Sequence, residues 1–306
     1  MPELPEVETI KRELAKVLIS KKIKSAEVFW YKTVAPLSPP EFSKQTKNKV
    51  VSSLERQAKI LIINFSGTTS LAIHLKMTGQ LIYVANKRPL ASKLSFDKNI
   101  ISRTPLDIIA GGHPNSQMTE KQPSKYTRLI FEFTDGSHLY FNDLRKFGWV
   151  SLVDDSQLKD LTRHIGVEPL SKIFTDQVLI DIFKKYPNRT VKQILMDQTL
   201  IAGIGNIYCD EACFIAKILP TRKSSATKSN QIKKLRESIV AVLKLSIQKK
   251  GTSSRNYRRS NGEPGGFVPH LNVYGRTSEP CKICGQKIKK IKHAGRGTHF
   301  CDRCQK

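Results

Sequence analysis

The chain of 306 residues lacks any apolar run of about 18 residues, the length that a membrane-spanning helix needs. Its N-terminus also lacks the apolar stretch of a secretory signal. Acidic residues are scarce: 26 aspartates and glutamates stand against 52 lysines and arginines, a formal net charge of +26. We therefore expect a cytoplasmic protein that has no membrane partner and binds something acidic.

The excess of positive charge points to nucleic acid first and to an anionic membrane surface second. A solvated lysine-rich surface is the structural alternative. The distribution of charge favours a partner, because residues 219–306 hold 21 lysines and arginines but only four acidic residues. We expect this end of the chain to contact phosphates.

Cysteine is scarce too, and four of the six lie near the C-terminus. Cys281 and Cys284, followed after sixteen residues by Cys301 and Cys304, form two CxxC knuckles that together hold one tetrahedral Zn²⁺. Four cysteine ligands leave no open coordination position, so the predicted ion is structural. The intervening segment predicts a basic hairpin with Arg296 near its tip, facing phosphate.

The remaining cysteines and the histidines of this module are assigned structural roles. Cys209 and Cys213 lie four residues apart, and we expect buried thiols because disulfides are rare inside cells. His293 and His299 are expected to be core or solvent-exposed side chains.

Hydrophobic periodicity predicts an α+β protein. Apolar residues from Leu4 to Leu18 recur at three- and four-residue spacing, which indicates an amphipathic helix. From about residue 26 to residue 153 short β-rich runs follow one another, and Asp135–Gly136 is a hairpin signal. We expect a β-sandwich or barrel here. Residues 85–125 have no sustained period and are expected to be a loop or insertion.

Helical periods dominate the second half of the chain. They occur in TDQVLIDIFKKY, VKQILMDQ, NIYCDEACFIAK and residues 228–249. The expected organisation is an N-terminal domain, a linker, a helical domain and a zinc module, at residues 1–155, 156–171, 172–274 and 275–306.

Gly203 and Gly205 stand just before one of these helices. A dinucleotide-binding GxGxxG pattern is excluded, because its third glycine would fall at Tyr208. Asn206 is instead expected near the helix N-cap, where backbone N–H groups and the helix dipole receive a DNA phosphate. A plain helix cap is the alternative.

Three glutamates, Glu3, Glu6 and Glu8, open this basic chain. Carboxylates near a helix N-terminus complement its dipole by about 0.3–1 kcal/mol. On the residues alone, this structural explanation is favoured for all three, and we keep it for Glu8.

Three stretches together resemble the formamidopyrimidine-DNA glycosylases, a bacterial DNA repair family: MPELPEVET, DQTLIAGIGNIYCDEA and VYGR with the cysteine module. The resemblance covers nearly the whole chain apart from residues 85–125. It implies an N-terminal helix with a β-sandwich, a helix–two-turn–helix domain and a zinc finger. It also implies a monomeric enzyme that excises oxidised purines, 8-oxoguanine and formamidopyrimidines, from double-stranded DNA and then cleaves the abasic strand by β,δ-elimination.

The resemblance places the catalytic groups at the N-terminus. Removal of Met1 would leave Pro2 as a terminal amine with a pKa near 8, which the helix lowers further. The neutral amine would attack C1′ of the damaged nucleotide and form a Schiff base. Glu3 resembles the general acid/base, Glu6 an orienting or proton-shuttling group, and Lys59 a phosphate-contacting lysine. Without the resemblance, Lys59 would be an ordinary strand-edge lysine.

Extrusion of the damaged base requires side chains that fill the stack. Met77 matches the family's inserting methionine, Arg145 its reader of the orphaned base, and Phe147 its wedge. Each alone would be an ordinary core or surface residue. Residues 251–266 resemble the lesion-capping loop.

The chain departs from the family pattern at several positions. Leu144 and Lys146 replace a proline and an arginine, Val167 replaces another proline, and KYTRL lacks a phosphate-contacting histidine. We expect residues 85–125 to decorate the domain rather than to bind DNA. Two alternative functions remain open: an endonuclease VIII-like glycosylase for oxidised pyrimidines, and a non-catalytic protein that binds damaged DNA. Leu4 and the Arg–Phe wedge favour the purine enzyme.

Overall fold

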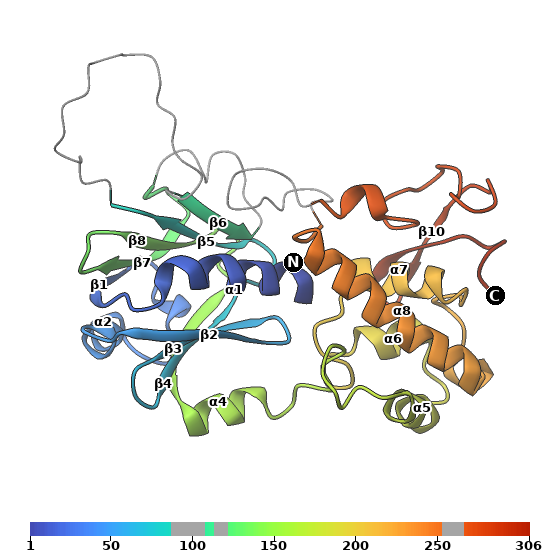
Figure 1. Cartoon of the computed structure of the whole chain (residues 1–306), viewed down its shortest axis with the longest axis horizontal. Helices are drawn as coiled ribbons and strands as arrows, with labels where there is room; N and C mark the ends of the chain where they lie inside the picture. Colours follow the sequence, from blue (N-terminus) through green and yellow to red (C-terminus); the bar gives the residue numbers. More distant parts are fainter. Residues whose placement is uncertain (87–107, 113–121, 253–265) are drawn as a thin grey trace, which may run out of the picture.

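The computed structural model describes residues 1–86, 108–112, 122–252 and 266–306. Two halves lie side by side, and the N-terminus lies between them (Figure 1). None of the helices in the described part of the chain is long and apolar enough to cross a membrane.

The first element is the predicted amphipathic helix, α1 (Leu4–Leu18). Its apolar positions Leu4, Leu14 and Leu18 are fully buried, as the three- and four-residue spacing requires. Pro5 lies in the first turn, where its missing N–H breaks no helical bond. Along its length α1 contacts strands of the first half and helix α8 of the second, so its N-terminal end is fixed at the junction.

The predicted β-sandwich is confirmed as two antiparallel sheets. One has the strand order β1-β7-β8-β5-β6 and the other β2-β3-β4-β9. Phe131 and Phe141 of the first sheet share one core with Leu61 and Ile73 of the second. The strands are β1 (Ile23–Val28), β2 (Val51–Gln57), β3 (Ile60–Phe65), β4 (Thr69–His74), β5 (Gly79–Val84), β6 (Ile108–Gly112), β7 (Thr127–Phe133), β8 (His138–Asp143) and β9 (Trp149–Asp154).

Three segments differ from the expectation. Ile108–Gly112 form strand β6, which pairs with β5, although residues 85–125 were expected to be a loop or insertion. Helix α2 (Pro39–Thr46) interrupts the β-rich region behind a capping box formed by Ser38 and Glu41. Residues 156–171, expected to be a linker, contain most of helix α4 (Asp155–Thr162).

The second half is helical, and its predicted helices are confirmed. They are α5 (Asp176–Lys185), α6 (Val191–Met196), α7 (Asn206–Ile215) and α8 (Ser229–Gln248); short 3₁₀ turns lie at η1 (Tyr31–Thr33) in the first half and at η2 (Ser224–Ala226) and η3 (Val268–His270) in the second. Cys209 and Cys213 of α7 are fully buried in the helical core, which confirms the prediction of buried thiols.

The C-terminal module contains the predicted hairpin, β10 (Lys289–His293) and β11 (Arg296–Phe300). Gly295 makes the turn with φ near +72°, a conformation that costs glycine little. The turn puts Arg296 beside the hairpin tip, exposed to solvent.

Candidate active site and DNA-facing surface

The N-terminal end of α1 is anchored to the helical domain. The Leu4 N–H donates to the Gly203 carbonyl oxygen at 3.1 Å. Gly203 has φ near +82°, and a β-carbon there would lie 2.7 Å from the Leu4 side chain. The GxG segment is therefore required for close approach of two chain segments. Pro2 and Glu3 are consequently buried at this junction.

Glu3 meets the N-terminus of α7. Its Oε1 accepts the Ile207 N–H at 3.1 Å, whereas Oε2 is buried and has no hydrogen-bond partner among the described residues. Burial raises the pKa of Glu3 to about 7, despite the opposing charge of Lys59. A carboxyl with this pKa can both give and take a proton near neutrality. Gly205 makes the room, because a β-carbon there would lie 2.2 Å from the Glu3 carboxyl carbon.

Glu6 occupies the next turn of α1 and is also buried. One carboxylate oxygen accepts the Glu3 N–H at 2.9 Å. The other accepts the Tyr208 hydroxyl and the Thr252 N–H, the latter at 2.8 Å. Burial raises the pKa of Glu6, and these donors oppose the shift. Glu6 thus joins the start of α1 to α7 and to the segment that follows α8.

Lys59 lies in the turn between β2 and β3 and points into the same junction. Its Nζ donates to the Ile204 carbonyl oxygen at 2.9 Å, and the residue is buried. Burial lowers the pKa of Lys59, Glu3 and Glu6 oppose that shift, and the nearby positive charge of Arg296 adds to it. Burial likewise lowers the pKa of the Met1 amino group. An amine at this end of α1 is thus driven towards its neutral, nucleophilic form.

Asn206 and the α7 N-terminus differ from the expectation in detail. Gly205 is the N-cap and Asn206 the first helical residue. The Asn206 side-chain amide donates to the Gly297 carbonyl oxygen of the zinc-module hairpin at 2.9 Å. Backbone N–H groups of this helix terminus were expected to receive a DNA phosphate, but one of them, that of Ile207, donates to Glu3. The helix terminus therefore orients a carboxyl group, and Asn206 joins the helical domain to the hairpin that carries Arg296.

The three residues expected to enter the DNA stack lie on two neighbouring turns of the first half. Met77 is in the turn between β4 and β5, and Arg145 and Phe147 follow β8. All three are exposed, Phe147 over 54% of its surface. The Arg145 guanidinium lies 4.7 Å from the centre of the Phe147 ring. We call these three residues the inserting triad.

Asp143 holds the inserting triad together. This fully buried carboxylate accepts the Phe147 and Gly148 N–H groups at 2.8 and 2.7 Å through one oxygen. Through the other it accepts the Thr78 hydroxyl and the Arg145 N–H. Thr78 follows Met77, so a single carboxylate fixes both turns. Charge-assisted hydrogen bonds of this kind are short and strong.

The four cysteines of the C-terminal module converge as predicted. Their Sγ atoms all lie within 4.8 Å of one another, with Cys281–Cys304 at 3.9 Å and Cys284–Cys301 at 3.5 Å. Tetrahedral Zn²⁺ with Zn–S bonds of about 2.3 Å requires S–S separations of about 3.8 Å. The residues therefore fit one structural zinc ion.

The zinc module is attached to the helical domain through α7. Lys192 and Asp210 form an ion pair of 2.6 Å with no exposed surface. Asp210 also accepts the His299 N–H at 2.8 Å, and His293 Nε2 lies 2.8 Å from the Thr190 hydroxyl. The histidines thus have structural partners, in agreement with the prediction. Removing either member of the Lys192–Asp210 pair would leave an uncompensated buried charge. The pair therefore helps to fix the hairpin that carries Arg296.

Sequence reasoning missed Tyr208, Thr252, Asp143 and Lys192. The sequence singles out Tyr208 only as the residue that breaks the GxGxxG pattern. Polar residues within apolar helical or strand patterns were the available signal, since such residues are buried only when paired. Their partners, however, lie elsewhere in the chain. The expected capping loop lies outside the described residues at 253–265; at its base, Thr252 pairs with Gly266.

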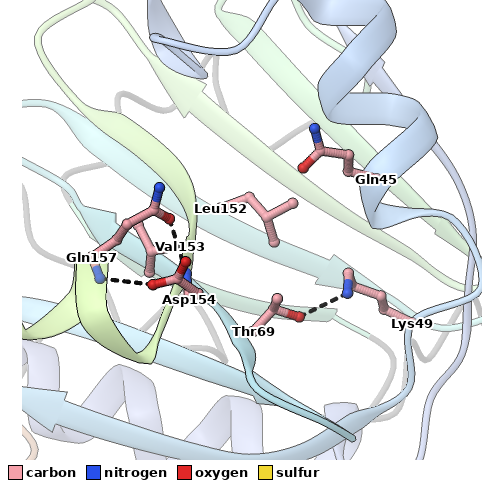
Figure 2. A pocket seen from close by; sticks show the side chains of 7 residues that line it. All are labelled: Gln45, Lys49, Thr69, Leu152, Val153, Asp154 and Gln157. Atoms are coloured by element: carbon pink, nitrogen blue, oxygen red, sulfur yellow. Dashed lines mark hydrogen bonds between the residues drawn. The ribbon is translucent and has the colours of Figure 1, made fainter.

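A hollow of about 330 Å³ lies elsewhere on the first half, away from these groups (Figure 2). Four of its lining residues pair with one another: Lys49 donates to Thr69, and Asp154 and Gln157 form the capping box of α4. None of Glu3, Glu6 and Lys59 lines this hollow.

Comparison with known proteins places these groups in a family. Three family models match: the formamidopyrimidine-DNA glycosylase N-terminal domain over residues 1–150, the H2TH domain of the same enzymes over 165–258, and the zinc finger found in FPG and IleRS over 278–306. The chain belongs to the formamidopyrimidine-DNA glycosylase family. The resemblance stated from the sequence is therefore confirmed, and with it the fold of a sandwich, a helix–two-turn–helix domain and a zinc finger.

Curated and structural relatives of this family match along the whole chain. The formamidopyrimidine-DNA glycosylases of Geobacillus kaustophilus and Bacillus licheniformis are 36% and 37% identical, each covering 100% of both chains. A Lactococcus lactis FPG mutant complexed with DNA containing Fapy-dG has a TM-score of 0.83 at 32% identity, covering 100% of both chains. The L. lactis enzyme with abasic-site DNA has a TM-score of 0.82 at 31% identity, covering 99% of both.

Proposed function

We propose that the chain is a bifunctional DNA glycosylase and abasic-site lyase that excises oxidised purines from double-stranded DNA. The observation that carries this proposal is the convergence of Pro2, Glu3, Glu6 and Lys59 at one buried junction between the two halves. Family membership and the match to structures containing Fapy-dG DNA and abasic DNA support the same activity. Its DNA substrate gives a cytoplasmic, nucleoid-associated location.

The reaction begins at the nitrogen of Pro2, which becomes a terminal secondary amine once Met1 is removed. The nitrogen lone pair forms a bond to C1′, the bond from C1′ to the base breaks, and the leaving base takes up a proton. Transfer of the amine proton to O4′ as the bond from C1′ to O4′ breaks opens the sugar ring and gives an iminium ion that serves as an electron sink. Removal of a C2′ proton then expels the 3′ phosphate, and removal of the C4′ proton expels the 5′ phosphate.

Glu3 is the proton-transfer group in this sequence. Its carboxyl stands at the residue next to the nucleophile, and one oxygen is held by α7 while the other has no partner among the described side chains. A pKa of about 7 leaves comparable amounts of acid and base at neutral pH. Glu6 positions this end of α1, because it accepts the Glu3 N–H.

Cationic and polar groups surround the reacting end and bind the phosphates of the damaged strand. Lys59 approaches from the sandwich, and Arg296 from the zinc-module hairpin. Asn206 acts with Arg296 by holding that hairpin through Gly297. The zinc ion, held by the four cysteines, braces this hairpin and takes no part in the chemistry.

The inserting triad supplies the second part of the function. Met77 fills the space left by the extruded nucleotide, Arg145 contacts the orphaned base, and Phe147 separates neighbouring base pairs. Their exposure without DNA and their fixed backbone suit insertion into a stack.

Oxidised pyrimidines are a second substrate class, favoured by one specific observation. The wild-type L. lactis enzyme complexed with DNA containing an oxidised pyrimidine matches this chain with a TM-score of 0.81 at 31% identity. The same fold therefore accommodates both classes in that relative. We propose oxidised purines as the main substrates and oxidised pyrimidines as secondary ones.

Borohydride trapping tests the proposal. Chain lacking Met1 is mixed with duplexes that carry 8-oxoguanine, an oxidised pyrimidine or an intact base, and the iminium is reduced to a stable crosslink. We expect strong crosslinking to 8-oxoguanine, weaker crosslinking to the pyrimidine and none to intact DNA. Pro2→Gly should lower the yield strongly, whereas Pro5→Ala in the same first turn should not. Binding without crosslinking would support the non-catalytic alternative.

A further inference from the structure

Three aromatic residues in a row stand beside the inserting triad. Phe29, Trp30 and Tyr31 follow strand β1, and Phe29 and Tyr31 are 50% and 57% exposed. Exposed apolar side chains are common singly, but neighbouring large aromatics form a patch that suits a binding surface. We call these three residues the aromatic strip.

The aromatic strip is fixed to the turn that carries Arg145 and Phe147. The Phe29 and Trp30 N–H groups donate to the Arg128 carbonyl oxygen at 2.8 and 3.3 Å. The Arg128 side chain in turn donates to the Asp143 carbonyl oxygen at 2.9 Å. Lys146 Nζ lies 4.0 Å from the centre of the Trp30 ring. The aromatic strip is thus continuous with the turn that carries Arg145 and Phe147.

The chemistry of this surface combines ring faces with cations. Lys146 is exposed and lies over Trp30, and Lys32 lies 5.8 Å from the centre of the Tyr31 ring. Lysines beside aromatic rings match nucleic acid, because the ammonium groups bind phosphate while the rings contact sugars and bases. Lys146 links the two surfaces, because it follows Arg145 in sequence and lies over Trp30.

We propose that the aromatic strip and Lys146 bind the DNA duplex beside the lesion, on the strand that carries the orphaned base. The strand assignment rests on the proposed function of Arg145 as reader of that base. Lys146 is its neighbour in sequence and is turned towards Trp30 in a left-handed conformation, φ near +58°. The surface therefore lengthens the contact with the undamaged strand.

A paired variant tests whether this surface binds DNA. Phe29→Ala with Tyr31→Ala removes two side chains that are half exposed or more, and we expect the Kd for duplex containing an abasic-site analogue to rise about 10-fold. The matched control, Ile19→Ala with Ile173→Ala, removes exposed apolar side chains far from the triad in sequence and should leave the Kd unchanged. An unchanged Kd in the aromatic variant overturns the proposal.

Truncated duplexes test the strand. Shortening the undamaged strand on one side of the orphaned base should abolish the difference in Kd between wild type and aromatic variant, whereas the same truncation of the damaged strand should preserve it. A difference that survives truncation of the undamaged strand on either side overturns the assignment. Wild-type crosslinking is measured on the same DNA. Normal wild-type crosslinking together with an unchanged Kd in the aromatic variant would refute only DNA binding by the aromatic strip. Loss of wild-type crosslinking would refute the proposed catalytic function.

Discussion

The buried end of α1 and the exposed inserting triad serve the same DNA but are built differently. Glu3, Glu6 and Lys59 are taken out of water, and burial shifts the pKa of each in the direction that disfavours charge. Met77 and Phe147 keep about half of their surface in water, and Arg145 lies against the Phe147 ring. Proton transfer near neutral pH needs the first arrangement, whereas insertion into a base stack needs the second.

Each region nevertheless depends on a buried carboxylate of its own that organises backbone groups. Glu6 joins α1 to Tyr208 and Thr252, and Asp143 joins the two turns of the triad. The difference is that Glu6 lies beside groups that react, whereas Asp143 acts only through the position of its neighbours. Variants of the two regions should therefore fail in different assays.

The largest expected effect is at Glu3. Glu3→Gln keeps an oxygen for the Ile207 N–H but removes the titrating group, so single-turnover base excision should fall about 10²–10⁴-fold with little change in DNA affinity. Glu8→Gln on the same helix is the control, because Glu8 pairs with Arg56 and Arg12 and should not affect the chemistry. Excision by the Glu3→Gln variant within threefold of wild type would remove Glu3 from the mechanism.

The same substitution should stabilise the fold. The folded-state pKa of Glu3, about 7, lies above the ordinary 4.5, so the folded chain binds this proton more tightly and stability falls as pH rises from 4.5 to 7. Above pH 7 the ionised carboxyl costs about 3 kcal/mol. Urea denaturation should show Glu3→Gln more stable than wild type at pH 8, with the gap closing towards pH 5.

The substitution Glu8→Gln is expected to change the stability of the fold in the opposite direction. Although burial opposes it, hydrogen bonds and ion pairs with Lys11, Arg12 and Arg56 lower the pKa of Glu8, so its contribution is present above pH 4.5 and is lost in acid. Glu8→Gln should therefore destabilise the fold at pH 8. If stability changed with pH in the same way for both variants, burial of Glu3 would not destabilise its charged form as proposed.

A smaller effect is expected at the inserting triad. Asp143→Asn replaces one acceptor oxygen by an N–H₂ group that faces N–H or O–H donors, so one of the two turns loses its anchor. We expect about a 10-fold loss of cleavage efficiency and a weaker rise of 2-aminopurine fluorescence beside the lesion, which reports unstacking. Thr78→Val should have a milder effect, and Asp160→Asn on exposed α4 none. Normal unstacking by the Asp143→Asn variant would show that the triad needs no such anchor.

Much of the fold follows from local patterns. The spacing from Leu4 to Leu18, the turn at Asp135–Gly136 and the two CxxC pairs each specify their structure within a few residues. Helix α2 could have been found too, since Ser38 and Glu41 form a readable capping box before it. Strand β6 could not, because pairing with β5 rather than local periodicity defines it.

The site divides in the same way. Pro2, Glu3 and Glu6 are neighbours in sequence, and the family motif identifies them. The Glu6 partners Tyr208 and Thr252 lie 202 and 246 residues away, and the ion pair of Lys192 with Asp210 depends on the packing of two helices. The reacting groups can therefore be predicted from sequence patterns more easily than the groups that hold them in place.

The identity of the attacking nitrogen is the central claim, and mass mapping of the reduced adduct tests it most directly. Crosslinked protein is digested, and the peptide that carries the sugar remnant is sequenced by mass spectrometry. We expect a modified peptide that begins at Pro2, formed only by molecules that have lost Met1. An adduct on the Lys59 side chain, or on chains that retain Met1, would contradict it.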